Sequence, residues 1–341
     1  MTQMENIIAE VTRRIFRDLG DPQALNGAAD ERWRTPLWRA LEESALTKAW
    51  VPEPLDGAGA RIADGFEILG IAGGFAVALP LAETLLAGWL LSRAGLRVPR
   101  GMLSVAPVRA GEGLKLGDDG KLSGFAASVP FARDVGHFAV VARRGKKAVI
   151  ALVERAHCAL RPGSSIAGEP RDDITFENGA PVSSADAPPE FRDDALMLMG
   201  AAVRAAQMSG ALQSILERCV AYAKERVAFE RPIGGFQAIK HMLADMFVAA
   251  KLAESNCYYA AWALSTNSAD LPLAAATARV SATAAFQQCA RDNIQVHGGM
   301  GFTWEFDCHL YYRRSNFLAL ELGGLSTWEG RVVANLSATA A

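Results

Sequence analysis

The chain has 341 residues, of which 35 are basic and 37 acidic, and 50% of its residues are hydrophobic. This composition excludes disordered and collagen-like chains, and a net charge of -2 gives no positive field for a nucleic-acid partner. The five cysteines are an odd number without a CxxC pair, so neither a metal site nor a disulfide framework is expected.

The N-terminal segment and the longest apolar run indicate a cytoplasmic protein without a membrane partner. Glu5, Glu10 and Asp18 interrupt residues 1–20, which therefore do not resemble a secretory signal or a transit peptide. The apolar run from Ile68 to Ala82 contains glycines and a proline. Because a membrane span needs about 20 apolar residues, this run predicts a buried helix and a turn.

Residues 1–100 predict an N-terminal helical domain. Ile8, Val11 and Ile15 recur at helical spacing, with charged residues on the opposite face. A second helix around Trp38 ends before the two prolines at residues 52 and 54, since proline cannot continue a helix. A third helix is predicted over residues 82–96.

Residues 101–190 predict a small, reduced antiparallel β domain. Residues 137–142 and 148–153 are rich in valine, isoleucine and alanine, and the basic segment between them predicts a hairpin loop. Turn signals at residues 118–120 and 177–179 support the same interpretation.

Residues 191–341 predict a C-terminal four-helix bundle. Apolar residues at helical spacing mark residues 212–223, 236–264 and 274–294, and a fourth helix is expected after Asp307. The predicted fold is thus mainly α with a small β domain.

Two stretches of the last region differ from ordinary bundle sequence. The first, residues 222–237, ends a helix in a charged turn, breaks at a proline and two glycines, and restarts at Gln237. The second, residues 295–302, has the sequence QVHGGMGF, whose glycines let backbone N–H groups approach a ligand closely.

Both stretches resemble motifs of the acyl-CoA dehydrogenase family. The first is similar to that family's R-x-x-F-G-x-P-I…Q segment and the second to its Q-x-x-G-G-x-G segment. Residues 51–59 resemble the family's N-terminal P-E-x-x-G-G-x-G turn, and residues 312–314 resemble its C-terminal arginine motif. The order of helical domain, β domain and four-helix bundle also matches the family over the whole chain.

The resemblance implies a flavoenzyme that removes two hydrogens across the α,β bond of an acyl-CoA thioester. In the family, FAD accepts the hydride, a carboxylate takes the α-proton, and an electron-transfer flavoprotein receives the electrons. It also implies the residues that hold FAD, across an interface between two subunits. These are Arg226, Phe229, Gln237, Gln295, Val296, His297, Gly298 and Gly299.

Each of these residues also has an ordinary structural interpretation. Arg226 by itself is more typical of a solvated helix end, and His297 could simply make a buried hydrogen bond. The glycines could form an ordinary helix C-cap. The functional interpretation depends on their occurring together.

Other parts of the family pattern are missing. The T-E-x-x-x-G-S-D segment of the β domain corresponds to residues 106–113, and the following strand, residues 122–128, has no tryptophan. Of the family's two positions for the catalytic base, one falls near Gly200 and Ala201 and the other near Leu322 and Gly323. None of these residues can take a proton.

The pattern is similar to the short subunit of bacterial heteromeric acyl-CoA dehydrogenases of the steroid-degrading type. We therefore expect a full-length homologous subunit to supply the base and the pocket for the flavin ring. Two alternatives remain open: a homo-oligomer that uses Glu329, which lies in a Trp-Glu-Gly sequence beyond the expected position, and a non-catalytic structural homologue. Glu321 lies one position from the expected base.

Overall fold

The computed structural model describes residues 3–26, 28, 31–109 and 111–339. Helices form the first part of the described chain, namely α1 (Gln3–Leu19), α2 (Pro22–Asn26), α3 (Arg34–Glu43), α4 (Ile62–Gly74) and α5 (Leu81–Arg93). The apolar run predicted as a buried helix and a turn forms the end of α4, the turn after it and the start of α5. Helix α3 ends before the two prolines, as predicted.

A single sheet forms the middle of the chain. Its strands are β1 (Leu103–Ala106), β2 (Leu114–Leu116), β3 (Leu122–Pro130), β4 (His137–Arg144), β5 (Lys147–Glu154), β6 (Cys158–Arg161), β7 (Arg171–Gly179) and β8 (Ser183–Asp186). Their order is β6-β7-β3-β2-β4-β5-β8, with β1 beside β4. The predicted hairpin is β4 and β5. The sheet is mixed rather than antiparallel, because β1 and β2 both run parallel to β4.

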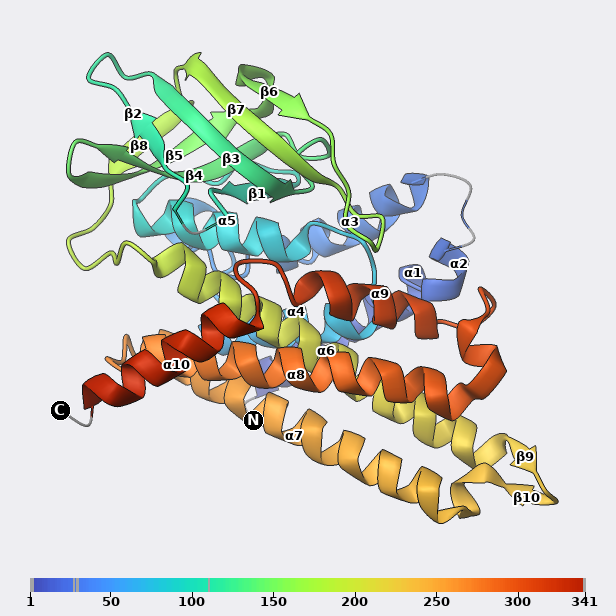
Figure 1. Ribbon diagram of the computed structural model, residues 1–341. Coiled ribbons are helices and arrows are strands. Elements are labelled where there is room, and N and C mark those ends of the chain that lie inside the picture. Colours follow the sequence, from blue (N-terminus) through green and yellow to red (C-terminus); the bar gives the residue numbers. More distant parts are fainter. Residues whose placement is uncertain (1–2, 27, 29–30, 110, 340–341) are drawn as a thin grey trace.

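The last part consists of α6 (Ala195–Glu225), α7 (Gln237–Ser265), α8 (Leu271–His297), α9 (Cys308–Leu318) and α10 (Leu325–Thr339). The helix predicted after Asp307 is therefore two helices, separated by a turn. Between α6 and α7, strands β9 (Val227–Ala228) and β10 (Arg231–Pro232) form a short hairpin. In Figure 1 this hairpin projects from the end of the bundle, and α5 passes directly beneath the sheet.

Helix α6 is the center of the fold. It is the one described helix that is long and apolar enough to cross a membrane, but 72% of that apolar window is buried by protein, as in a core helix. Helix α4 packs very closely against it, because a β-carbon on Gly210 would come within 1.7 Å of the Gly70 carbonyl oxygen. This contact requires glycine and brings the N-terminal helices onto the bundle.

Candidate functional site

A central cavity of about 540 Å³ lies between the sheet, the start of α6 and the segment after α9. Its wall is largely apolar and includes Leu86, Val105, Val108, Pro130, Leu196 and Phe317. Arg109 and Ser128 also line the cavity. They belong to residues 106–113 and 122–128, which correspond to the family's flavin-ring segments. The Arg109 guanidinium donates a hydrogen bond to the Ser128 hydroxyl over 2.6 Å. Ala110, in the same stretch, lies outside the described residues. No tryptophan is among the described residues that line this cavity.

The two positions at which a catalytic base was sought come together in this cavity. Gly200 lies in the second turn of α6, and Leu322 in the turn between α9 and α10. A β-carbon on Gly200 would lie 2.6 Å from a Leu322 methyl carbon. Both residues line the cavity, and neither side chain can accept a proton.

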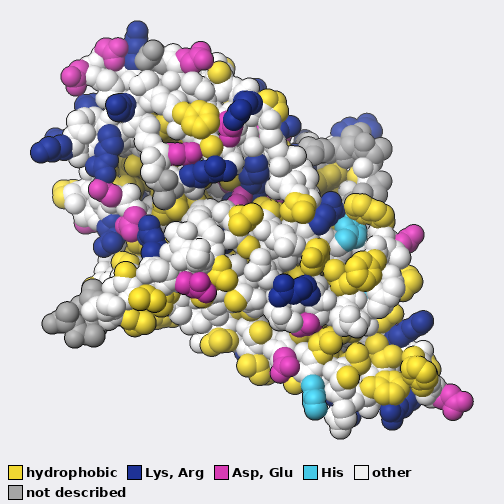
Figure 2. All heavy atoms as spheres, viewed as in Figure 1, with side chains coloured by type: hydrophobic (Ala, Val, Ile, Leu, Met, Phe, Trp, Pro, Cys, Tyr) yellow, Lys and Arg dark blue, Asp and Glu magenta, His cyan; other side chains and the backbone are white. Residues whose placement is uncertain are grey.

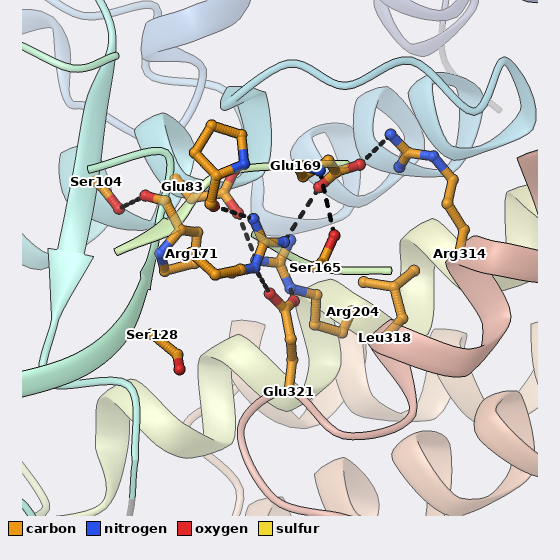
Figure 3. A network of polar contacts seen from close by, with 12 residues as sticks. Glu83, Ser104, Ser128, Ser165, Glu169, Arg171, Arg204, Arg314, Leu318 and Glu321 are labelled. Carbon is orange, nitrogen blue, oxygen red and sulfur yellow. Dashed lines mark hydrogen bonds and ion pairs between the residues drawn. The ribbon is translucent and has the colours of Figure 1, made fainter. Parts of the chain in front are cut away.

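Glu321 also lines the cavity, but two arginines hold its carboxylate. Its oxygens lie 2.5 Å from Arg171 Nε and 2.8 Å from Arg204 Nε. All three side chains are at most 12% exposed. Figure 3 shows the Glu321 side chain pointing up toward the guanidinium groups of Arg171 and Arg204.

The ion pairs continue on both sides of Glu321. Arg204 also pairs with Glu83 of α5, and Arg171 with Glu169, which in turn pairs with Arg314 of α9 (Figure 3). Three carboxylates therefore face three guanidinium groups, so the network is close to neutral. A buried charge requires such a partner because its transfer from water is costly.

The network keeps Glu321 ionised. Burial by itself would raise the pKa of Glu321, but the positive charges of Arg171 and Arg204 outweigh burial and leave that pKa below its ordinary value. A carboxylate with a low pKa and two fixed partners is a poor proton acceptor. Glu321 is therefore suited to hold the sheet and the helices together rather than to act as a base.

Two further side chains fix the turn that carries Glu321 and Leu322. Buried Arg279 of α8 donates to the carbonyl oxygens of Leu318 and Glu321, and burial lowers the pKa of Arg279 to about 10. The indole N–H of Trp328 donates to the Leu322 carbonyl oxygen over 3.0 Å. Glu329, the alternative candidate for the base, follows Trp328 in α10, is exposed, and does not line the cavity.

A second cavity, of about 460 Å³, brings together residues from the two sequence motifs. Arg226, at the end of α6, and His297, at the end of α8, both line it, together with Tyr222. The Tyr222 and His297 rings lie 4.2 Å apart, center to center. The Arg226 side chain is exposed and has no ion-pair partner among the described residues.

His297 is buried and hydrogen-bonded, as its structural interpretation predicts. Its Nδ1 lies 2.8 Å from the Asn293 carbonyl oxygen, so Nδ1 carries the proton and Nε2 is free to accept one. Burial lowers the pKa of His297, which keeps the ring neutral at pH 7. A neutral aromatic pair beside a free guanidinium suits a planar, phosphate-bearing ligand.

The glycine segment after His297 is open. The backbone at residue 298 has a φ of +59°, a conformation that favours glycine. A β-carbon on Gly299, in contrast, would meet no atom within 4 Å. The backbone at Gly299 is therefore open, and an open glycine backbone permits close approach of a ligand. Gln295 is exposed beside them, and Val296 is part of the core, with 4% of its surface exposed.

The β9–β10 hairpin presents Phe229 to solvent. Phe229 and Glu230 both have positive φ, 49° and 65°, as a two-residue hairpin turn requires, and the cost of this conformation is normally avoided by glycine or asparagine. The Phe229 ring is 88% exposed and contacts only the edge of Phe236 among the rings. Gln237, the first residue of α7, is also exposed. Figure 2 shows apolar side chains gathered at this end of the molecule.

Sequence reasoning did not find the ion network or Tyr222. Glu83 and Arg204 each lie alone within an apolar helical segment, and a lone charge in such a segment is a sign of a buried pair. The partners are 121 residues apart, so the pairing itself cannot be recognised from local sequence.

Comparison with known proteins agrees with this architecture. Residues 194–326 match the family model of the acyl-CoA dehydrogenase C-terminal domain. The acyl-CoA dehydrogenase IpdE2 of Mycobacterium tuberculosis is 32% identical over 290 residues, which cover 85% of this chain and 83% of that protein.

Two solved structures share the fold over almost the whole chain. The ChsE4-ChsE5 complex from Mycobacterium tuberculosis matches with a TM-score of 0.86 and 24% identity, over 99% of this chain and 98% of that one. The steroid ACAD Tcur3481-Tcur3483 matches with a TM-score of 0.86 and 24% identity, over 99% of both chains.

Proposed function

Because this chain belongs to the acyl-CoA dehydrogenase family, we propose that it is the short subunit of a heteromeric enzyme that dehydrogenates an acyl-CoA thioester. A full-length homologous subunit supplies the catalytic carboxylate and the pocket for the flavin ring. This chain supplies the groups that hold the other end of the FAD. The family's enzymes are oxidoreductases that act on acyl-CoA, and FAD is the cofactor that membership implies.

The observation that carries this proposal is the pairing of Gly200 with Leu322. Both family positions for the base meet in the central cavity, and both are apolar. The nearest carboxylate, Glu321, is held by Arg171 and Arg204. Among the described residues that line this cavity, Glu321 is the one with a carboxylate, so no unpaired carboxylate is present there.

The second cavity fits the diphosphate and adenosine end of FAD. Arg226 offers a guanidinium that can donate two parallel hydrogen bonds to a phosphate. The Tyr222 and His297 rings line the same cavity, and the open backbone of Gly298 and Gly299 follows His297 directly in the chain. Arg226, Tyr222 and His297 would hold the distal half of FAD, and the bound cofactor would supply the hydride-accepting chemistry.

The exposed Phe229 supports contact with a second chain. A ring that is 88% exposed on a turn with two positive φ values gains nothing from packing in this chain. An aromatic side chain of this kind is typical of a residue that fills a pocket on a partner. Gln237 lies at the adjoining end of α7.

The relatives support a proposal for the substrate class and the partner. The structural relatives include a two-protein complex and a steroid ACAD, which supports a fused-ring acyl-CoA as substrate and a full-length subunit as partner. We further propose that an electron-transfer flavoprotein accepts the electrons and that the enzyme is cytoplasmic.

The test is to express the chain alone and together with a full-length homologue, and to measure FAD content and acyl-CoA oxidation with an artificial electron acceptor. We expect the chain alone to be inactive and the complex to be yellow and active. The proposal is wrong if the chain alone binds stoichiometric FAD and oxidises the thioester. A colourless, inactive complex would instead support the non-catalytic alternative.

A further inference from the structure

A separate cavity, of about 390 Å³, lies where the three parts of the chain meet. Its walls come from α2 and Trp33, from the turn between α4 and α5, from Ala167 and Gly168 of the segment before β7, and from Trp304 and α9. It shares no lining residue with the two cavities described above. Junctions between domains are common places for ligand sites, and the volume lies within the usual range for them.

Three arginines line this cavity, namely Arg34, Arg313 and Arg314, and none of the described lining residues is acidic. Arg34 pairs with Asp134 over 2.8 Å, and Arg314 pairs with Glu169 of the ion network. The carboxylates of Asp134 and Glu169, which do not line the cavity, therefore already balance the charges of Arg34 and Arg314.

Arg313 differs from the other two. Among the described residues it has no carboxylate within ion-pair distance, and its Nε is buried without a hydrogen-bond partner. Its Nη2 lies 3.2 Å from His309 Nδ1, so that ring nitrogen accepts and the histidine is neutral. Burial and the neighbouring Arg314 both lower the pKa of Arg313. Within the part of the chain that the structure describes, Arg313 is therefore the one guanidinium of this cavity without a carboxylate partner.

Flat apolar surface lies beside this charge. The Arg313 guanidinium sits 5.1 Å from the center of the Trp304 ring, and the Trp304 side chain is 64% exposed. The cavity is also lined by four apolar side chains, those of Leu25, Trp33, Val77 and Leu310. The exposed indole can stack on a planar group of a ligand, and the guanidinium can donate two parallel hydrogen bonds to an anion.

We propose that this cavity binds a monoanion in which a carboxylate is attached to a planar apolar body, that is, an aryl or fused-ring carboxylate. One unpaired guanidinium balances one negative charge, so a dianionic phosphate would keep an unbalanced charge. The carboxylate takes two hydrogen bonds from Arg313, and the rings lie against Trp304. This site is independent of the proposed FAD site.

The experiment measures binding of 2-naphthoate to the FAD-saturated protein, with its full-length partner if one is needed, by isothermal titration calorimetry. The uncharged 2-naphthamide has the same body and serves as the ligand control. Arg313→Gln removes the charge, and Arg97→Gln, at an exposed arginine outside the cavity, is the matched control. A hydrogen bond to a charged group contributes about 1.5–3 kcal/mol, which corresponds to roughly a 10- to 100-fold change in Kd.

We expect Arg313→Gln to weaken 2-naphthoate binding by roughly 10- to 100-fold and Arg97→Gln to leave it unchanged. The affinity of the wild-type protein for 2-naphthamide should equal the affinity of the Arg313→Gln variant for 2-naphthoate. Trp304→Ala, at an exposed position, provides a second variant and should weaken binding about fivefold. Absence of 2-naphthoate binding, equal affinity for the amide, or unchanged affinity in either cavity variant would overturn the proposal. Binding of AMP without binding of 2-naphthoate would overturn the ligand class.

Discussion

Leu322 lies so close to Gly200 that a β-carbon on Gly200 would come within 2.6 Å of a Leu322 methyl carbon. The two residues are far apart in the chain, on α6 and in the turn before α10, yet they share one wall of the central cavity. Their positions are the two at which the family resemblance placed a catalytic base.

Arg226→Gln should weaken FAD binding in the complex by roughly 10- to 100-fold, since it removes charge-assisted hydrogen bonds of about 1.5–3 kcal/mol. Stability should not change, because the Arg226 side chain is exposed and makes no ion pair with the described residues. Fluorescence titration with FAD gives the affinity. Arg97→Gln is the control, and equal FAD affinity in both variants would contradict the assignment of Arg226.

Glu321→Gln should lower the free energy of unfolding by about 3–5 kcal/mol, because it removes the carboxylate that Arg171 and Arg204 share and leaves the buried network with an excess positive charge. Urea unfolding followed by circular dichroism measures this change. Glu329→Gln, at an exposed glutamate of α10, should change stability by less than about 0.5 kcal/mol and leave the activity of the complex intact. Loss of activity in Glu329→Gln with FAD still bound would favour the homo-oligomeric alternative.

The stabilisation by Glu321 should depend on pH. The pKa of Glu321 in the folded protein is below its ordinary value of 4.5, so its contribution is present above about pH 4.5 and is lost as the pH falls through the folded-state pKa. The difference in unfolding free energy between wild type and Glu321→Gln should therefore be full at pH 7 and shrink in acid. A difference that stays constant from pH 7 to pH 3 would show that folding does not lower the pKa of Glu321.

Gly210→Ala should destabilise the protein by about 3 kcal/mol or more, because its β-carbon would meet the Gly70 backbone at 1.7 Å. Gly200→Ala should cost at most about 1 kcal/mol, because a leucine methyl group can turn away and alanine favours the helix. Thermal unfolding compares the two variants. Equal stability losses would indicate that α4 and α6 separate easily, contrary to their glycine contact.

Phe229→Ala should leave the stability of the isolated chain unchanged but weaken assembly with the full-length partner by at least tenfold, or about 1.4 kcal/mol. The ring is 88% exposed and therefore contributes little to this chain's core. Sedimentation velocity at several concentrations measures the assembly. Val182→Ala, at an exposed apolar residue between β7 and β8, should assemble as wild type does. If both variants assemble normally, Phe229 is not an interface residue.

Local sequence was sufficient to predict much of the fold and the candidate FAD-binding residues around Arg226 and His297. Helical and strand periodicity depends on which face of each element meets the core, so the helices, the β4–β5 hairpin and the order of the three regions could be predicted from short windows. The residues around Arg226 and His297 could be found because their spacing within each motif is local. The parallel pairing of β1 and β2 with β4 could not, since it depends on a long-range crossover.

The ion network and the fate of Glu321 were decided only by tertiary structure. In the sequence, Glu83 and Arg204 are lone charges in apolar helical segments, which indicates burial, but nothing local says that they meet each other or Glu321. Folding brings them from three separate segments into a buried position, where each charge needs an opposite charge beside it. A carboxylate one position from the expected base thus becomes a structural ion pair, because its chemistry depends on neighbours that are distant in the chain.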